Sequence, residues 1–232
     1  MTMENFWVII AVQFCWFLTV TAWYGNIRKV IKFILFGGIL GIPYGFAMDA
    51  IIGHHHEIFA YGSLGQSESF LFLNALFSYG LAISTTFNLN YLVGKGGLHS
   101  NRQAFYLTIV AVAVIVAKNK FGVDGILLSM FIFGIAIISF TEAMFIFSSG
   151  RGLLIDIFTG RVRVAWLFLF CFLTGSIYET ANLFFPLWEW QNDFPSVTGN
   201  TILIAALGYF VLIYPMLFIS YTFQSLFAPR LA

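Results

Sequence analysis

Long apolar runs separated by short polar stretches dominate the chain. An apolar run of about 20 residues is long enough to cross a hydrocarbon core of roughly 30 Å as a helix. Such runs lie near residues 5–24, 30–52, 70–92, 103–121, 126–148, 164–187 and 201–224. The fourth is the weakest, because its apolar core from Ala104 to Ala117 is short. The pattern predicts an all-α fold, a bundle of seven transmembrane helices.

Composition supports this prediction and leaves no room for a soluble domain. Hydrophobic residues make up 60% of the 232 residues and charged residues 9%, whereas soluble domains carry roughly 25% charged residues. We therefore expect one integral membrane domain spanning residues 1–232. The net charge of +1 gives no reason to expect a nucleic-acid partner. Cys15 and Cys171 lie inside spans and are interpreted as core residues.

The basic residues predict the orientation of the chain in the membrane. With seven spans, nine of the eleven lysines and arginines fall on one face: Arg28, Lys29, Lys32, Lys95, Arg102, Arg151, Arg161, Arg163 and Arg230. Basic loops mark the cytoplasmic side, so the N-terminus is expected outside and the C-terminus in the cytoplasm. The acidic segment Met1–Asn5 does not resemble the start of a cleaved signal peptide, so we expect the first span to be retained.

Two segments of the chain resemble each other at a constant offset. Gly41-Ile-Pro-Tyr44-Gly-Phe-Ala47 aligns with Gly175-Ser-Ile-Tyr178-Glu-Thr-Ala181, since 175 − 41 and 178 − 44 are both 134. Ala75–Tyr79 also resembles Ala206–Tyr209, at a slightly smaller offset. This predicts a three-helix unit, spans one to three, repeated as spans five to seven with span four as the connector. Such repeats point the same way and are related by an axis along the membrane normal. The alternative is chance similarity among apolar helices.

Two acidic residues inside apolar runs are the leading candidates for chemistry. Glu179 lies in the sixth span and Asp49 in the second. A charge at such a depth is costly, so an acid there marks a functional site by default. Burial favours the protonated form of a carboxyl, which can then act as a general acid. In the repeat Glu179 corresponds to Gly45, one turn from Asp49, so both acids are expected to face one cavity. The alternative is a hydrogen bond to a neighbouring helix and nothing more.

Aromatic residues surround both acids in the sequence. They make up 19% of the chain, and those nearest the acids are Tyr44, Phe59, Tyr178, Trp188 and Trp190. Such rings can line a cavity for a long apolar ligand, and their faces stabilise cations. Packing and interfacial anchoring are the alternative roles. A third buried acid, Glu142, is expected to pair with arginines of the next loop, which are Arg151, Arg161 and Arg163.

Other kinds of site find little support. In His54-His55-His56-Glu57, adjacent side chains of a helix point about 100° apart and cannot all reach one ion, so we expect no metal site. The last span, from Thr201 to Gln224, has no lysine that could bind retinal as a Schiff base. Neither a phosphate-binding glycine loop nor a Ser/His/Asp arrangement occurs. Acid-initiated chemistry requires no cofactor, and none is expected.

Three segments resemble the lycopene cyclase domain of the small membrane carotenoid cyclases. They are Asp49-Ala-Ile-Ile-Gly53, Phe59-Ala-Tyr61 and Gln66-Ser-Glu68-Ser-Phe-Leu-Phe72. That family has an intramembrane Asp, then an aromatic pair, then Pro-x-Glu-Glu before a Phe-rich run; Gln66–Ser69 keeps one acid of the last motif. Glu179 followed by Trp188-Glu-Trp190 is similar to the acid and Trp-x-Tyr of the second half. The resemblance implies a duplicated three-helix fold and roles for Asp49, Glu68 and Glu179.

These observations favour a membrane-embedded, acid-catalysed cyclase or isomerase of a long isoprenoid or carotenoid-like lipid. Glu179 and Asp49 would donate the proton or stabilise the cation, and Glu68 would be an auxiliary acid. We expect a bacterial or archaeal cell membrane, and a membrane-protein partner or a homo-oligomer is compatible with the sequence. One alternative is a non-catalytic subunit that binds lipid or pigment in a larger membrane complex. Another is a small proton-coupled transporter, although the run from Val164 to Leu173 offers almost no polar path.

Overall fold

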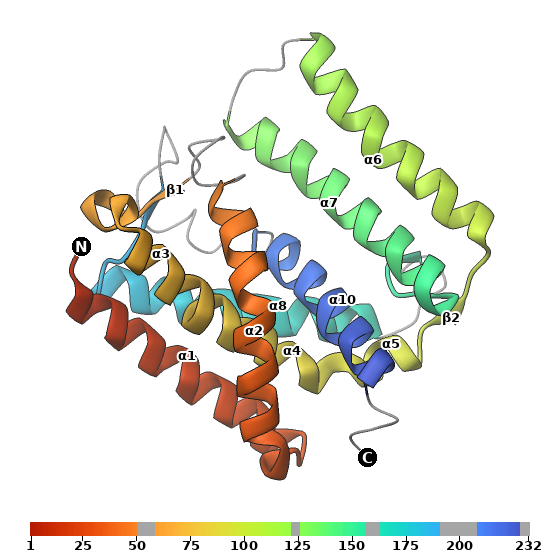
Figure 1. Cartoon of the computed structure of the whole chain (residues 1–232). Coiled ribbons are helices and arrows are strands. Elements are labelled where there is room, and N and C mark those ends of the chain that lie inside the picture. The colour runs from red at the N-terminus through yellow and green to blue at the C-terminus, as the bar shows by residue number, and fades with distance from the viewer. Residues whose placement is uncertain (51–58, 122–125, 156–162, 191–207, 228–232) are drawn as a thin grey trace.

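Seven helices that are long and apolar enough to cross a membrane form the computed structural model of the protein (Figure 1). The structure describes residues 1–50, 59–121, 126–155, 163–190 and 208–227. Within these ranges the spans are Met3–Trp23, Ile27–Met48, Glu68–Gly94, Asn101–Phe121, Phe131–Ser149, Val164–Phe184 and Tyr209–Phe227. The all-α, seven-span prediction is confirmed. The α-helix of the second span ends at Met48, and Asp49 and Ala50 continue it as π-helix to the end of this described range.

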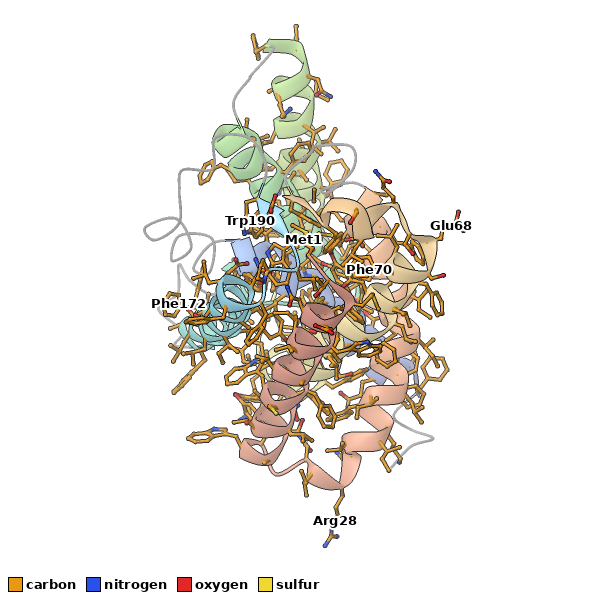
Figure 2. The ribbon with its side chains drawn as sticks, turned by 90° about the vertical axis from the view of Figure 1, so that its left-hand side faces the viewer. Met1, Arg28, Glu68, Phe70, Phe172 and Trp190 are labelled. Carbon is orange, nitrogen blue, oxygen red and sulfur yellow. The ribbon has the colours of Figure 1, made fainter. Side chains whose placement is uncertain are left out.

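The first two helices form a hairpin. Helix α1 (Met3–Trp23) begins at Thr2, whose side chain accepts a hydrogen bond from the Asn5 amide at 3.2 Å, a typical N-cap. Gly25 follows the helix with φ of 67°, a conformation that glycine adopts without steric cost. The short helix η1 (Ile27–Lys29) then leads into α2 (Val30–Met48). Figure 2 shows Met1 and Arg28 at opposite ends of this hairpin, and which end is cytoplasmic stays a prediction.

The third span changes its helical winding several times. It consists of α3 (Glu68–Leu73), the π-helical segment η4 (Asn74–Tyr79), α4 (Gly80–Thr86), the 3₁₀ segment η5 (Phe87–Leu89) and α5 (Asn90–Gly94). Helix α2 packs closely against it through glycines. A Cβ atom on Gly45 would lie 2.8 Å from the Ala75 Cα and 2.7 Å from the Tyr79 ring. π-helical segments are rare and frequently occur at functional sites.

The fourth and fifth spans form a second hairpin, set apart from α1 and α2 in Figure 1. Helix α6 (Asn101–Phe121) packs mainly against α7 (Ile126–Ser149). Ala104 and Ala111 are the buried residues of α6, whereas apolar side chains such as Phe105 and Val112 are more than half exposed. A helix with a single main neighbour presents most of its surface to the membrane, so apolar residues are expected on all of its sides.

The remaining helices, α8 (Arg163–Phe184) and α10 (Tyr209–Phe227), complete the core, and two short sheets tie the loops together. Strand β1 (Phe59–Ala60) pairs antiparallel with β4 (Glu189–Trp190), so that Phe59 lies opposite Trp190. Strand β2 (Gly97–Leu98) pairs with β3 (Arg151–Gly152) at the other end of the bundle. The predicted three-helix repeat stays a prediction, although β1 and β4 follow the second and sixth spans that it equates.

The buried acid Glu142 accepts hydrogen bonds from backbone amides. The predicted pairing of Glu142 with Arg151 is therefore wrong. Its Oε1 accepts hydrogen bonds from the amides of Leu154 at 2.9 Å and Ile155 at 3.3 Å, and its Oε2 accepts one from the Tyr214 hydroxyl. The Arg151 guanidinium donates instead to the Gly96 carbonyl at 2.8 Å. Arg161 and the Arg163 side chain lie outside the described residues. Glu142 therefore has a structural role: its hydrogen bonds hold the loop that follows α7 against the helix.

Candidate functional site

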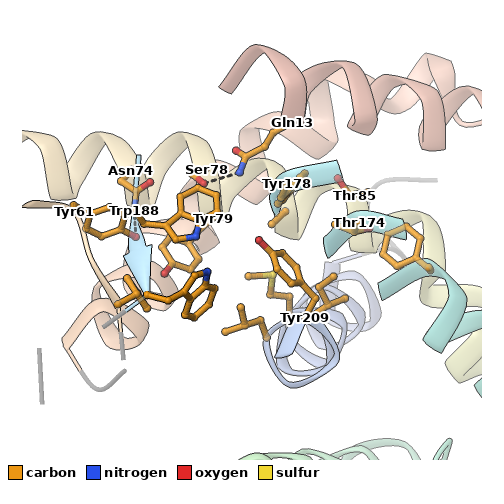
Figure 3. A pocket seen from close by; sticks show the side chains of 17 residues that line it. Gln13, Tyr61, Asn74, Ser78, Tyr79, Thr85, Thr174, Tyr178, Trp188 and Tyr209 are labelled. Carbon is orange, nitrogen blue, oxygen red and sulfur yellow. Dashed lines mark hydrogen bonds between the residues drawn. The ribbon is translucent and has the colours of Figure 1, made fainter. Parts of the chain in front are cut away.

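An aromatic cavity of about 90 Å³ lies among α1, the third span, α8 and α10, beneath the β1–β4 sheet (Figure 3). Four hydroxyl-bearing rings line it: Tyr61, Tyr79, Tyr178 and Tyr209. Four further rings line it without a hydroxyl: Phe59, Phe170, Trp188 and Trp190. Smaller polar side chains complete the wall, among them Gln13, Asn74, Ser78 and Thr174. Most of the cavity surface is therefore apolar, and a few polar atoms face it. This pattern is typical of small-molecule sites.

Asp49 lies behind one part of this wall. Its Oδ1 accepts hydrogen bonds from the hydroxyls of Tyr79 at 2.8 Å and Tyr61 at 3.1 Å, and Asn74 donates to the Tyr61 hydroxyl at 2.9 Å. Burial, followed by the nearby Asp49 charge, raises the pKa of Tyr61 well above its usual range. The Asp49 Oδ2 is buried and has no hydrogen-bond partner in the described structure.

Glu179 lies behind another part of the wall and is 3% exposed. Its Oε1 accepts a hydrogen bond from the Tyr209 hydroxyl at 3.0 Å, and its Oε2 accepts one from the Trp190 indole at 3.1 Å. An indole N–H can only donate, whereas a tyrosine hydroxyl can donate or accept. The indole therefore keeps Oε2 an acceptor, and a proton on this carboxyl belongs on Oε1, where it faces Tyr209.

The two acids thus have the same relation to the cavity. Neither carboxyl belongs to its lining, but hydrogen-bond partners of both do: Tyr61 and Tyr79 for Asp49, and Tyr209 and Trp190 for Glu179. Each acid reaches the cavity through a tyrosine hydroxyl. The structure therefore brings the two predicted acids to one cavity, with a ring between each carboxyl and the space that a ligand would occupy.

The other predicted site residues divide into two groups. Phe59, Tyr178, Trp188 and Trp190 line the cavity. Tyr44 does not, because its hydroxyl donates to the Leu212 carbonyl at 2.7 Å and so joins α2 to the last span. Glu68 is exposed in the first turn of α3 and points away from the bundle in Figure 2. The structure therefore does not bring Glu68 to the cavity. The segment His54–Glu57 lies outside the described residues.

Several functional candidates were missed from the sequence. Tyr79 and Tyr209 connect the acids to the cavity, and the similarity of Ala75–Tyr79 to Ala206–Tyr209 is the signal that marked them. Asn182 was also missed. Its Oδ1 accepts from the amides of Leu187 at 2.8 Å and Trp188 at 3.1 Å, and its Nδ2 donates to the Trp188 carbonyl at 2.9 Å. These three bonds hold the turn that places Trp188 at the cavity.

The arrangement is suited to proton transfer in a small, shielded space. Hydroxyls backed by carboxyls can deliver or remove a proton, and the surrounding rings can stabilise a positive charge. Among the residues that the structure describes, no group of three or more His, Cys, Asp or Glu side chains is placed to hold a metal ion. No family model, curated protein or solved structure matches the chain.

Proposed function

We propose that the protein is a membrane-embedded enzyme that cyclises or isomerises an isoprenoid-type lipid by acid catalysis. One observation carries this proposal: two buried acids, Asp49 and Glu179, reach the same aromatic cavity through tyrosine hydroxyls. Intramembrane acids are expensive to keep and are rarely without a role. The aromatic wall supports the same chemistry, because ring faces stabilise a carbocation after an alkene is protonated.

The proposed reaction uses one proton of Glu179 and returns it at the end. The Tyr209 hydroxyl gives its proton to an alkene carbon of the substrate as it takes one from Glu179 Oε1. The alkene π pair forms the new C–H bond and leaves a cation on the neighbouring carbon. In a cyclisation the π pair of a second double bond closes the ring. Loss of a proton from a carbon beside the final cation restores a double bond, and that proton returns through Tyr209 to Glu179. Asp49, behind Tyr79, is the second acid of the site and stabilises the cation.

The size of the cavity limits what enters it. A volume of about 90 Å³ is well below the roughly 300–1,000 Å³ of sites that enclose a whole drug-sized ligand. It suits one end of an isoprenoid chain, with the remainder lying between helices or in lipid. The reacting double bonds would then be those nearest the chain end.

The test is conversion of linear isoprenoids by membranes that contain the protein, followed by mass spectrometry of the lipid extract. Glu179→Gln keeps the size of the acid but cannot release a proton, so it should lower turnover by at least about 100-fold, the low end of the loss for general acid catalysis. Asp49→Asn should cause a comparable loss. Glu4→Gln is the matched control, since Glu4 is an exposed acid in the first turn of α1. Absence of any conversion by the unmodified protein would refute the proposal.

A second candidate is a non-catalytic subunit that binds lipid or pigment in a larger complex. The observation that favours it is the largely exposed apolar surface of α6, where Phe105, Ile109 and Val116 are about half exposed. A partner helix or lipid would cover such a surface. Under this candidate Glu179→Gln leaves lipid binding unchanged and the protein co-purifies with other chains.

Transport is the third candidate. It is favoured by a column of polar side chains between the C-terminal parts of the third and last spans. The Thr86 hydroxyl lies 3.1 Å from that of Ser220, which donates to Asn90 at 3.0 Å, and Asn90 donates to Gln224 at 2.6 Å. These residues belong to the third and last spans, so a polar path need not follow the apolar half of α8. Proton-coupled uptake into vesicles, abolished by Asn90→Leu, would favour transport over catalysis.

A further inference from the structure

Two buried side chains of the cavity wall each keep a polar atom that has no hydrogen-bond partner in the part of the chain that the structure describes. They are the Oε1 of Gln13 and the hydroxyl of Tyr178. Gln13 is 2% exposed and Tyr178 is 5% exposed, so bulk water does not reach either group. More than nine in ten buried polar groups in proteins are hydrogen-bonded, and an exception calls for an explanation such as a ligand.

The packing of α1 against α8 places Gln13 and Tyr178 at matching levels of the two helices. The Trp16 indole donates to the Thr174 hydroxyl at 3.0 Å, which fixes the register of the two helices. The Asn5 side chain donates to the Pro186 carbonyl at 2.9 Å, so the start of α1 lies beside the end of α8. Gln13 lies three residues before Trp16, and Tyr178 lies four after Thr174. Each therefore stands one turn nearer that end, on the same helix face as the hydrogen-bonded residue. Figure 3 shows both side chains among those that line the cavity.

Both side chains are held in place by their other contacts. The Gln13 amide nitrogen donates to the Ser78 hydroxyl at 2.8 Å. Exchanging the oxygen and nitrogen of that amide would only leave the nitrogen without a partner instead. The Tyr178 ring packs edge-on against Tyr209 with 5.9 Å between the ring centres. A ligand in the cavity can therefore supply the missing partner.

We propose that these two groups bind a hydroxyl at the end of the ligand. A hydroxyl can donate to Gln13 and accept from Tyr178 at once, whereas a pure hydrocarbon leaves both groups unsatisfied. The ligand class is then an isoprenoid alcohol. This inference rests on the proposed function only for the isoprenoid skeleton. The cavity, at about 90 Å³, is matched to a single isoprene unit that carries its oxygen.

The test compares prenol, an isoprenoid alcohol of one isoprene unit, with the hydrocarbon of the same carbon skeleton. Binding of each to the full chain in lipid nanodiscs is measured by titration calorimetry, and the signal of empty nanodiscs is subtracted. We expect prenol to bind at least about tenfold more tightly, because a site built to hydrogen-bond a hydroxyl rejects the analogue that lacks it. Tyr178→Phe should reduce this ratio to about threefold or less, and Gln13→Leu should do the same.

The matched control is Tyr24→Phe. The Tyr24 hydroxyl lies 3.4 Å from that of Tyr91, at the other end of α1, so this variant should keep the ratio of the unmodified protein. If Tyr178→Phe does not fold, Gln13→Leu decides. Equal affinity for alcohol and hydrocarbon, no binding of prenol, or an unchanged ratio in the folded variants would each overturn the inference.

The binding test and the conversion test can fail separately. Conversion of a hydrocarbon substrate without any preference for prenol would overturn the alcohol inference and leave the acid-catalysed function standing. A preference for prenol that depends on Tyr178, with no conversion of any isoprenoid, would refute the enzyme and leave an alcohol-binding site.

Discussion

Tyr209→Phe is the sharpest perturbation of the proposed proton path. Tyr209 is 7% exposed, and its hydroxyl donates to Glu179 Oε1 at 3.0 Å while its ring faces the cavity. The Trp190 indole donates to Oε2, so among the described residues a proton on Glu179 Oε1 reaches a ligand through the Tyr209 hydroxyl. Removing this hydroxyl should therefore lower turnover as much as Glu179→Gln does, at least about 100-fold. That loss corresponds to about 2.7 kcal/mol of transition-state stabilisation.

A double-mutant cycle separates this role from simple support of the Glu179 side chain. Residues that act in one step are not additive, so turnover by the double variant Tyr209→Phe/Glu179→Gln should be close to that of either single variant. The assay is the conversion of linear isoprenoids in membranes, with Tyr24→Phe as the control that removes a distant hydroxyl. Full activity of Tyr209→Phe beside an inactive Glu179→Gln would refute the path through Tyr209. Losses that multiply in the double variant would assign the two residues to separate steps.

Two further predictions concern stability. Gly45→Ala should lower the unfolding free energy by about 1–3 kcal/mol through overpacking against the third span, whereas Gly94→Ala meets nothing within 4 Å and should not. Asn182→Ala should cost about 1–3 kcal/mol, because it leaves the amides of Leu187 and Trp188 without partners, and should shift the tryptophan fluorescence.

Run length alone was enough to predict the seven helices, because a membrane span needs only a continuous apolar stretch. The same pattern does not show which side of a helix faces its neighbours. Phe105 of α6 is 58% exposed and Phe145 of α7 is fully buried, yet both lie in equally apolar runs. Local winding also escaped prediction, since the π-helical segment Asn74–Tyr79 depends on contacts with α2 that the local sequence does not encode.

For the candidate site, the sequence identified the two acids and four of the lining rings, but not the tyrosines that stand between the acids and the cavity. Asp49 and Glu179 stood out because a carboxyl in an apolar run is rare, whereas Tyr79 and Tyr209 were two of ten tyrosines in an aromatic-rich chain. Glu68 is the reverse case, because the structure does not bring it to the cavity. Its place in a motif-like segment implied a role, but Ser67 caps the helix and leaves Glu68 exposed in the first turn of α3. At that position the positive end of the helix dipole stabilises a carboxylate.

The position of the acids behind tyrosines has a chemical consequence. A carboxylate in direct contact with a carbocation would be trapped by forming an ester bond with it, and the reaction would stop. A hydroxyl between the two lets the carboxyl supply and recover a proton while its charge acts on the cation from a greater distance. The rings of Tyr79 and Tyr209 occupy that intermediate position. Under the proposed function, the burial of Asp49 and Glu179 behind the wall keeps both acids near the cation without a bond to it.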